Sequence, residues 1–166
     1  MPKVLISYRQ ESETHAQQVR ALAERLRDRL APLGIEIVLD QFLLEQKPGG
    51  PTESWPMWCA NQVKESARVV MIVSPGWADC FNGKESPDAG AGVAWEANII
   101  RQELYGSHAK SDKYRVCLVD TSYASCTPTE LVGFHRFISP ANEEDLCAWL
   151  REIAPVTIHM RINNRT

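Results

Sequence analysis

Long apolar runs are missing from this sequence, and none approaches the roughly 20 residues that a helix needs to cross a bilayer. The first residues also lack the pattern of a signal peptide. Excess positive charge is missing too, because 18 lysines and arginines stand against 21 acidic residues and give a formal net charge of −3. We therefore expect a soluble, cytoplasmic protein with no membrane partner. We also expect no nucleic-acid partner, since such proteins rely on attraction to phosphates.

The glycine and serine motifs of common α/β enzymes are also absent. Neither G-x-G-x-x-G nor G-x-x-x-x-G-K-[ST] occurs, which argues against a Rossmann dinucleotide cradle and a P-loop. The lack of G-x-S-x-G argues against a hydrolase triad. The five cysteines form no C-x-x-C pair and the four histidines no i, i+4 pair. We therefore predict no metal site and no bound cofactor.

Short apolar runs and amphipathic segments alternate along the chain. The apolar runs predict five buried strands, at residues 4–7, 35–39, 68–74, 114–119 and 133–138. After the first of them, leucines recur on one helical face until Gly34 ends the helix. This order predicts an α/β, flavodoxin-like three-layer fold with a parallel sheet of about five strands. We expect one domain over residues 1–155, and a tail or a linker to a further domain over residues 156–166.

Two segments are rich in turn-forming residues. Residues 41–54 contain Pro48-Gly-Gly-Pro51 and few apolar anchors, which predicts a long mobile loop at the carboxyl edge of the sheet. Residues 79–92 predict a second exposed loop. A helical period then begins at Val93 and ends at Gly106.

Polar residues follow the first two predicted strands. Ser7, Tyr8 and Arg9 end the first strand, where hydroxyls and a guanidinium can hold a phosphate or a ribose. Asp40 ends the second strand. Ligands of open parallel sheets bind at this edge, so these residues are candidates for a binding site. The alternative interpretation is that they form ordinary polar turns.

Glu96 lies at the start of the third predicted helix, directly after Trp95. One interpretation is a solvated first-turn acid that the helix dipole favours. The other is a functional carboxylate that points toward the carboxyl edge of the sheet. Glu103, seven residues later, is predicted to be an ordinary surface acid. We expect most of the first four tryptophans to pack in the core, with an exposed one able to stack on a base; they are Trp55, Trp58, Trp77 and Trp95.

Five segments together resemble a bacterial SEFIR domain, which belongs to the TIR-like superfamily. They are Leu5-Ile-Ser-Tyr8, Leu33-Gly-Ile-Glu-Ile-Val-Leu-Asp-Gln41, Trp55-Pro-Met-Trp58, Ala67-Arg-Val-Val-Met-Ile-Val-Ser-Pro75 and Trp95-Glu-Ala-Asn-Ile-Ile-Arg-Gln-Glu-Leu-Tyr105. The resemblance covers about residues 3–152. It implies a flavodoxin-like fold and assembly through homotypic contacts.

The wider superfamily contains signalling adaptors and enzymes that cleave the nicotinamide–ribose bond of NAD⁺ with a glutamate on a helix. The resemblance thus implies that Glu96 is catalytic and that NAD⁺ is the substrate. The residues implied to contact or cover the substrate are Ser7, Tyr8, Arg9, Asp40 and Trp95. In these enzymes a Trp-Cys pair precedes the glutamate, whereas here Trp95 adjoins Glu96 and the cysteine is absent.

Bacterial members of the superfamily often act in antiphage defence, where they deplete NAD⁺ once assembled. The resemblance therefore implies self-association, and other domains of a longer chain are further candidate partners. We predict that the 41–54 loop docks against a second copy through Phe42, Leu43 and Leu44. The alternative is that these three side chains cover the edge of the core. The alternative function is a homotypic interaction or signalling module without catalysis.

Overall fold

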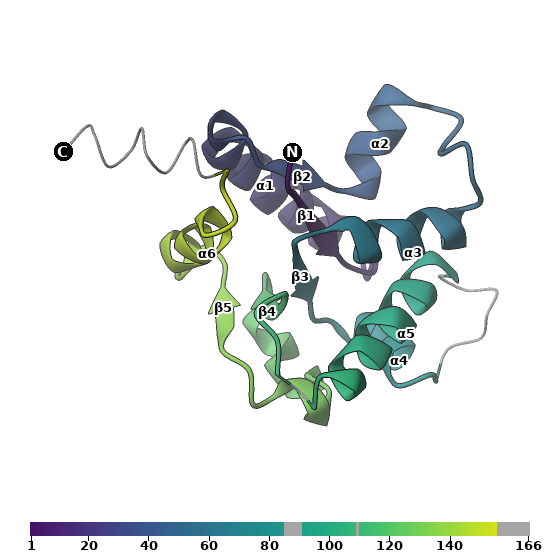
Figure 1. The fold of residues 1–166 in the computed structure, drawn as a ribbon. Coiled ribbons are helices and arrows are strands. Elements are labelled where there is room, and N and C mark those ends of the chain that lie inside the picture. The colour runs from purple at the N-terminus through teal and green to yellow at the C-terminus, as the bar shows by residue number, and fades with distance from the viewer. Residues whose placement is uncertain (85–90, 109, 156–166) are drawn as a thin grey trace.

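The computed structural model describes residues 1–84, 91–108 and 110–155, and the predicted tail at 156–166 lies outside this part (Figure 1). Five strands form one parallel sheet in the order β2-β1-β3-β4-β5. The strands are β1 (Lys3–Ser7), β2 (Glu36–Val38), β3 (Arg68–Ile72), β4 (Tyr114–Leu118) and β5 (Arg136–Ile138). The predicted α/β, flavodoxin-like fold is confirmed.

Helices cover both faces of the sheet and make the three layers (Figure 1). The helices are α1 (Glu13–Leu30), α2 (Asp40–Gln46), α3 (Trp55–Glu65), α4 (Pro75–Phe81), α5 (Ala91–Gly106) and α6 (Glu143–Arg151). Three short 3₁₀ helices are η1 (Ala31–Leu33), η2 (Thr121–Cys126) and η3 (Thr129–Leu131). Buried residues of α1 and α6 share one core, and those of α3, α4 and α5 share the other.

Alternation along the central strands creates these two cores. On β1, Val4 and Ile6 face α1 and α6, whereas Leu5 faces α3, α4 and α5. The same period of two on β3 sends Val70 to the first core and Met71 to the second. Because both faces are covered, the strands read as continuous apolar runs in the sequence.

The predicted loop at 41–54 is wrong for its first part. Residues Asp40–Gln46 form α2, and only the segment from 47 to 54 connects it to α3. The helix forms here because Phe42 is only 8% exposed and packs into the core that α1 and α6 share. Leu43 packs against the other core, whereas Leu44 remains exposed.

The predicted exposed loop at 79–92 is also shorter than expected. Its first residues belong to α4, where Trp77 and Phe81 are buried and Ser74 caps the helix by accepting from the Trp77 backbone N–H. Helix α5 begins at Ala91, and residues 85–90 lie outside the described part of the chain. Burial of the Trp77 and Phe81 rings thus places the first residues of the predicted loop in a helix.

Truncating Phe42 and Leu44 in turn compares a buried side chain of α2 with an exposed one. Phe42 is 8% exposed with the Arg27 guanidinium 4.3 Å from its ring centroid, whereas Leu44 is 42% exposed. We expect Phe42→Ala to lower the free energy of unfolding by about 3–5 kcal/mol, and Leu44→Ala to change it by less than about 0.5 kcal/mol. Urea denaturation of both variants measures these losses. Equal small losses would contradict the core position of Phe42.

Candidate functional site

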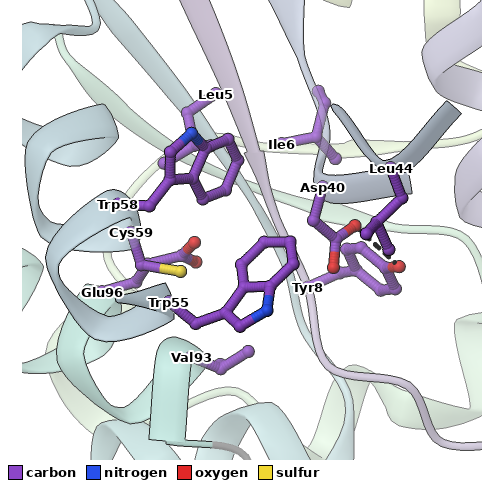
Figure 2. A pocket seen from close by; sticks show the side chains of 10 residues that line it. All are labelled: Leu5, Ile6, Tyr8, Asp40, Leu44, Trp55, Trp58, Cys59, Val93 and Glu96. Atoms are coloured by element: carbon purple, nitrogen blue, oxygen red, sulfur yellow. Dashed lines mark hydrogen bonds between the residues drawn. The ribbon is translucent and has the colours of Figure 1, made fainter. Parts of the chain in front are cut away.

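A cavity of about 210 Å³ opens at the carboxyl edge of the sheet, where β1, α2, α3 and α5 meet (Figure 2). It is lined by Leu5, Ile6, Tyr8, Asp40, Leu44, Trp55, Trp58, Cys59, Val93 and Glu96. The location follows from the topology, because parallel strands all end at one edge and leave a crevice beyond their carboxyl ends.

Glu96 reaches this cavity from the second turn of α5 and is only 5% exposed. The interpretation of Glu96 as a solvated first-turn acid is therefore wrong. Helix α5 begins at Ala91 rather than at Val93, and α3 packs against it. Glu96 therefore points toward α3 and the cavity, and neither the start of α5 nor its packing on α3 could be read from the sequence.

Two side chains donate hydrogen bonds to the Glu96 carboxylate. Ser7 Oγ, at the end of β1, donates to Glu96 Oε2 at 2.5 Å. The thiol of Cys59 on α3 donates a second hydrogen bond. Figure 2 shows the Cys59 sulfur beside the Glu96 carboxylate. The carboxylate is thus held by groups from two elements that lie far apart in the sequence.

Burial raises the pKa of Glu96 to about 7. The hydrogen bonds from Ser7 and Cys59 lower this pKa, and the negative charge of Asp40 raises it. Burial also raises the pKa of the Cys59 thiol far above its usual range, so Cys59 stays a donor. A carboxyl group with a pKa near neutrality can both hold and release a proton, which is typical of functional sites.

Tyr8 and Asp40 form a second polar pair in the cavity. The Tyr8 hydroxyl donates to Asp40 Oδ1 at 3.0 Å, and Gln41 Nε2 donates to the Tyr8 oxygen at 2.7 Å. Burial raises the pKa of both Tyr8 and Asp40. The cavity therefore presents two carboxyl groups, Asp40 and Glu96, which favour a ligand with positive charge or hydrogen-bond donors.

Two tryptophans of α3 supply the aromatic surface of the cavity. Trp55 and Trp58 meet edge to face, with ring centroids 5.6 Å apart, and Trp55 is 37% exposed. A Cβ atom on Gly50 would lie 3.5 Å from the Trp55 ring, so the segment before α3 passes close to that ring. Exposed indole rings can stack on a planar heterocycle. The sequence signal was the three-residue spacing of Trp55 and Trp58 after the Ser54 cap.

Three of the candidates named from the sequence are not among the residues that line the cavity. Ser7 is completely buried, and its hydroxyl is engaged with Glu96 and Trp77. Arg9 is partly buried and contacts the sulfur of Cys80 at 3.5 Å. Trp95 is 49% exposed and lies outside the set of residues that line the cavity. Tyr8, Asp40 and Glu96 are the predicted residues that the fold brings together here.

The described residues contain no group of histidines, cysteines and acids arranged to hold a metal ion. Among the same residues, no helix has the length and apolar character to span a membrane. The cavity itself offers an acid with a pKa near neutrality, a second acid, and two indole rings.

The raised pKa of Glu96 makes the free energy of unfolding depend on pH. The folded protein keeps this proton up to about pH 7, whereas the unfolded chain releases it near pH 4.5. Stability therefore falls as the pH rises through this window, by about 3 kcal/mol for this one group. We expect Glu96→Gln to melt at a higher temperature than the wild type at pH 8, with the difference shrinking toward pH 5.

Thermal unfolding across this pH range measures the difference, with Glu103→Gln as the control. Glu103 is partly exposed and lies outside the cavity, so its variant removes a carboxylate from the same helix without touching the cavity. A difference for Glu96→Gln that does not change with pH would contradict the burial of its charge.

Comparison with known proteins agrees with this architecture. The family model of the SEFIR domain matches residues 2–150 of the chain. A crystal structure of a prokaryotic SEFIR domain is similar in fold, with a TM-score of 0.55 and 24% sequence identity over 92% of this chain and 96% of that chain. No curated protein matches. The chain therefore belongs to the SEFIR domain family, a TIR-like class of signalling and interaction modules.

Proposed function

We propose that this SEFIR domain cleaves the nicotinamide–ribose bond of NAD⁺ and that Glu96 is its catalytic residue. One observation carries the proposal: a buried carboxyl group with a pKa of about 7 lines a cavity that two indole rings also line. The resemblance to TIR-like enzymes with a helix-borne glutamate adds support. Removal of NAD⁺ by an assembled protein would suit a role in antiphage defence or immune signalling.

Binding would use the aromatic and acidic sides of the cavity. The nicotinamide ring of NAD⁺ is planar and positively charged, so it can stack on Trp55 with a cation–π contribution. Asp40 and ionised Glu96 supply negative charge to the same space. Tyr8 holds Asp40 through its hydroxyl group and fixes the direction of that carboxylate.

The bond between C1′ of the ribose and the nicotinamide nitrogen breaks, and its electron pair leaves with neutral nicotinamide. Positive charge then develops on the ribose, where ionised Glu96 stabilises it. A water molecule attacks C1′ and gives up a proton to produce ADP-ribose. Glu96 can accept that proton, because its pKa lies near the working pH.

An interaction module without catalysis is the second candidate, and exposed apolar side chains favour it. Large apolar residues stand exposed on the helices around the cavity: Leu44, Trp55, Met57 and Trp95. Exposed groups of this kind are typical of protein interfaces. They also suit self-association, which SEFIR domains mediate as a family. On this view Leu44 remains a docking candidate, whereas Phe42 packs in the core.

Replacing Glu96 tests the catalytic proposal. We expect Glu96→Gln to lower the rate of NAD⁺ cleavage by about 100-fold or more, because it removes the charge that stabilises the transition state. Glu103→Gln is the control and should keep most of the activity, since Glu103 accepts hydrogen bonds from Tyr114 and Lys113 outside the cavity.

Nicotinamide release is measured by chromatography with the protein dilute, concentrated and crowded. If the wild type cleaves NAD⁺ and Glu96→Gln is equally fast, the assignment of Glu96 fails. No cleavage by the wild type under any of these conditions would favour the interaction module.

Replacing tryptophans tests which indole binds the substrate. Trp55 lines the cavity and Trp95 does not, although both are partly exposed. We expect Trp55→Ala to raise the KM for NAD⁺ by about tenfold, because a base stacked on an aromatic ring contributes about 1–3 kcal/mol. Trp95→Ala should leave KM nearly unchanged. Steady-state kinetics of the two variants at one protein concentration measure these KM values. A raised KM in Trp95→Ala but not in Trp55→Ala would show that the nicotinamide stacks on Trp95 instead.

A further inference from the structure

A chain of three buried side chains ends on the carboxylate of Glu96. Trp77 Nε1 on α4 donates to Ser7 Oγ at 3.1 Å, and Ser7 Oγ donates to Glu96 Oε2 at 2.5 Å. Trp77 and Ser7 are completely buried, and Glu96 is 5% exposed. Solvent therefore does not compete for these hydrogen bonds, and α4, β1 and α5 each supply one member.

The donor inventory of the side chains determines the direction of the first hydrogen bond, and the geometry gives the second. An indole N–H can only donate, and a serine hydroxyl has one hydrogen and two acceptor lone pairs. Because Trp77 occupies one lone pair of Ser7 Oγ, the single Ser7 hydrogen is free to point at Glu96 Oε2, 2.5 Å away. In this arrangement Glu96 Oε2 accepts, which leaves the other oxygen, Oε1, to carry a proton.

The donor end of the chain is held in place by core packing. The Trp77 ring stacks on Phe81 with centroids 5.5 Å apart and an interplanar angle of 20°. The Trp77 backbone N–H donates to Ser74 Oγ. Ser7 is the last residue of β1 and is paired with Met71 of β3 in the sheet register. Ser7 and Trp77 therefore have little freedom to move when Glu96 changes its charge.

We propose that Ser7 and Trp77 are positioning residues that make Oε2 of Glu96 a permanent acceptor and leave Oε1 as the oxygen that gains and loses the proton. This inference rests on the proposed function for its consequence in catalysis. It also replaces the predicted role of Ser7 in contacting the substrate, because the single hydroxyl hydrogen is already used. Cys59 is a weaker donor to the same carboxylate, so it cannot by itself determine which of the two oxygens carries the proton.

Loss of either positioning residue has a defined effect on the titration of Glu96. The Ser7 hydroxyl donates to the charged carboxylate, so it lowers the pKa that burial raises. Ser7→Ala should therefore move the pKa of Glu96 above its value of about 7. Ser7→Cys keeps a weak donor and should fall between the wild type and Ser7→Ala. Trp77→Phe keeps a ring for stacking and removes the indole N–H, so it should move the pKa in the same direction.

The experiment is a carbon-13 NMR titration of the glutamate carboxyl groups in the whole chain, with the Glu96 signal assigned by its loss in Glu96→Gln. Ser66→Ala is the matched control, because Ser66 is also a buried serine and sits beyond α3, with no hydrogen-bond partner for its hydroxyl among the described residues. This control should leave the Glu96 titration at the wild-type pH. Amide spectra verify that each variant is folded.

Kinetics add a second readout. Ser7→Ala should lower kcat by about tenfold with little change in KM, and should move the acidic limb of the pH profile to higher pH. An unchanged Glu96 titration in Ser7→Ala, or in both Ser7→Cys and Trp77→Phe if Ser7→Ala does not fold, would overturn the proposal. The titration needs no substrate. A wild type that leaves NAD⁺ intact would therefore end the proposed function without deciding the hydrogen-bond chain.

Discussion

The cavity depends on one constraint, the burial of the Glu96 carboxyl group beneath the carboxyl edge of the sheet. An isolated ionised carboxylate is costly to bury, so the surrounding groups must supply donors or the group must take up a proton. This site does both, since Ser7 and Cys59 donate while burial raises the pKa of Glu96 to about 7. The charge of Glu96 is therefore conditional on pH and on what occupies the cavity, as the proposed catalytic role requires.

That constraint links one layer of helices to the site. Trp77, which donates to Ser7, is itself part of the core that α3, α4 and α5 share. The position of the Glu96 carboxyl group therefore depends on how this core packs. A buried carboxyl group that ionises near neutral pH lowers the free energy of unfolding, and proteins commonly keep such a group where function requires it. An interaction module without catalysis would be more stable with an apolar side chain in place of Glu96.

The sequence predicted three residues of the cavity but not the contacts that hold them. Tyr8, Asp40 and Glu96 were expected at the carboxyl edge of the sheet, and the fold brings all three to one cavity. Cys59 was not among the candidates, because its contact with Glu96 comes from α3 packing on α5, and nothing in the local sequence indicates which helices meet. Trp95 was favoured by its adjacency to Glu96, but neighbours on a helix point in different directions.

Local apolar patterns suffice to predict the fold class, because strands buried on both faces and a leucine face on α1 admit few topologies. They do not predict α2, which forms where Phe42 finds a core to pack against. The raised pKa of Glu96 cannot be inferred from local sequence. A pKa depends on the dielectric and on donors within a few ångströms, and Ser7 and Cys59 are 89 and 37 residues away along the chain.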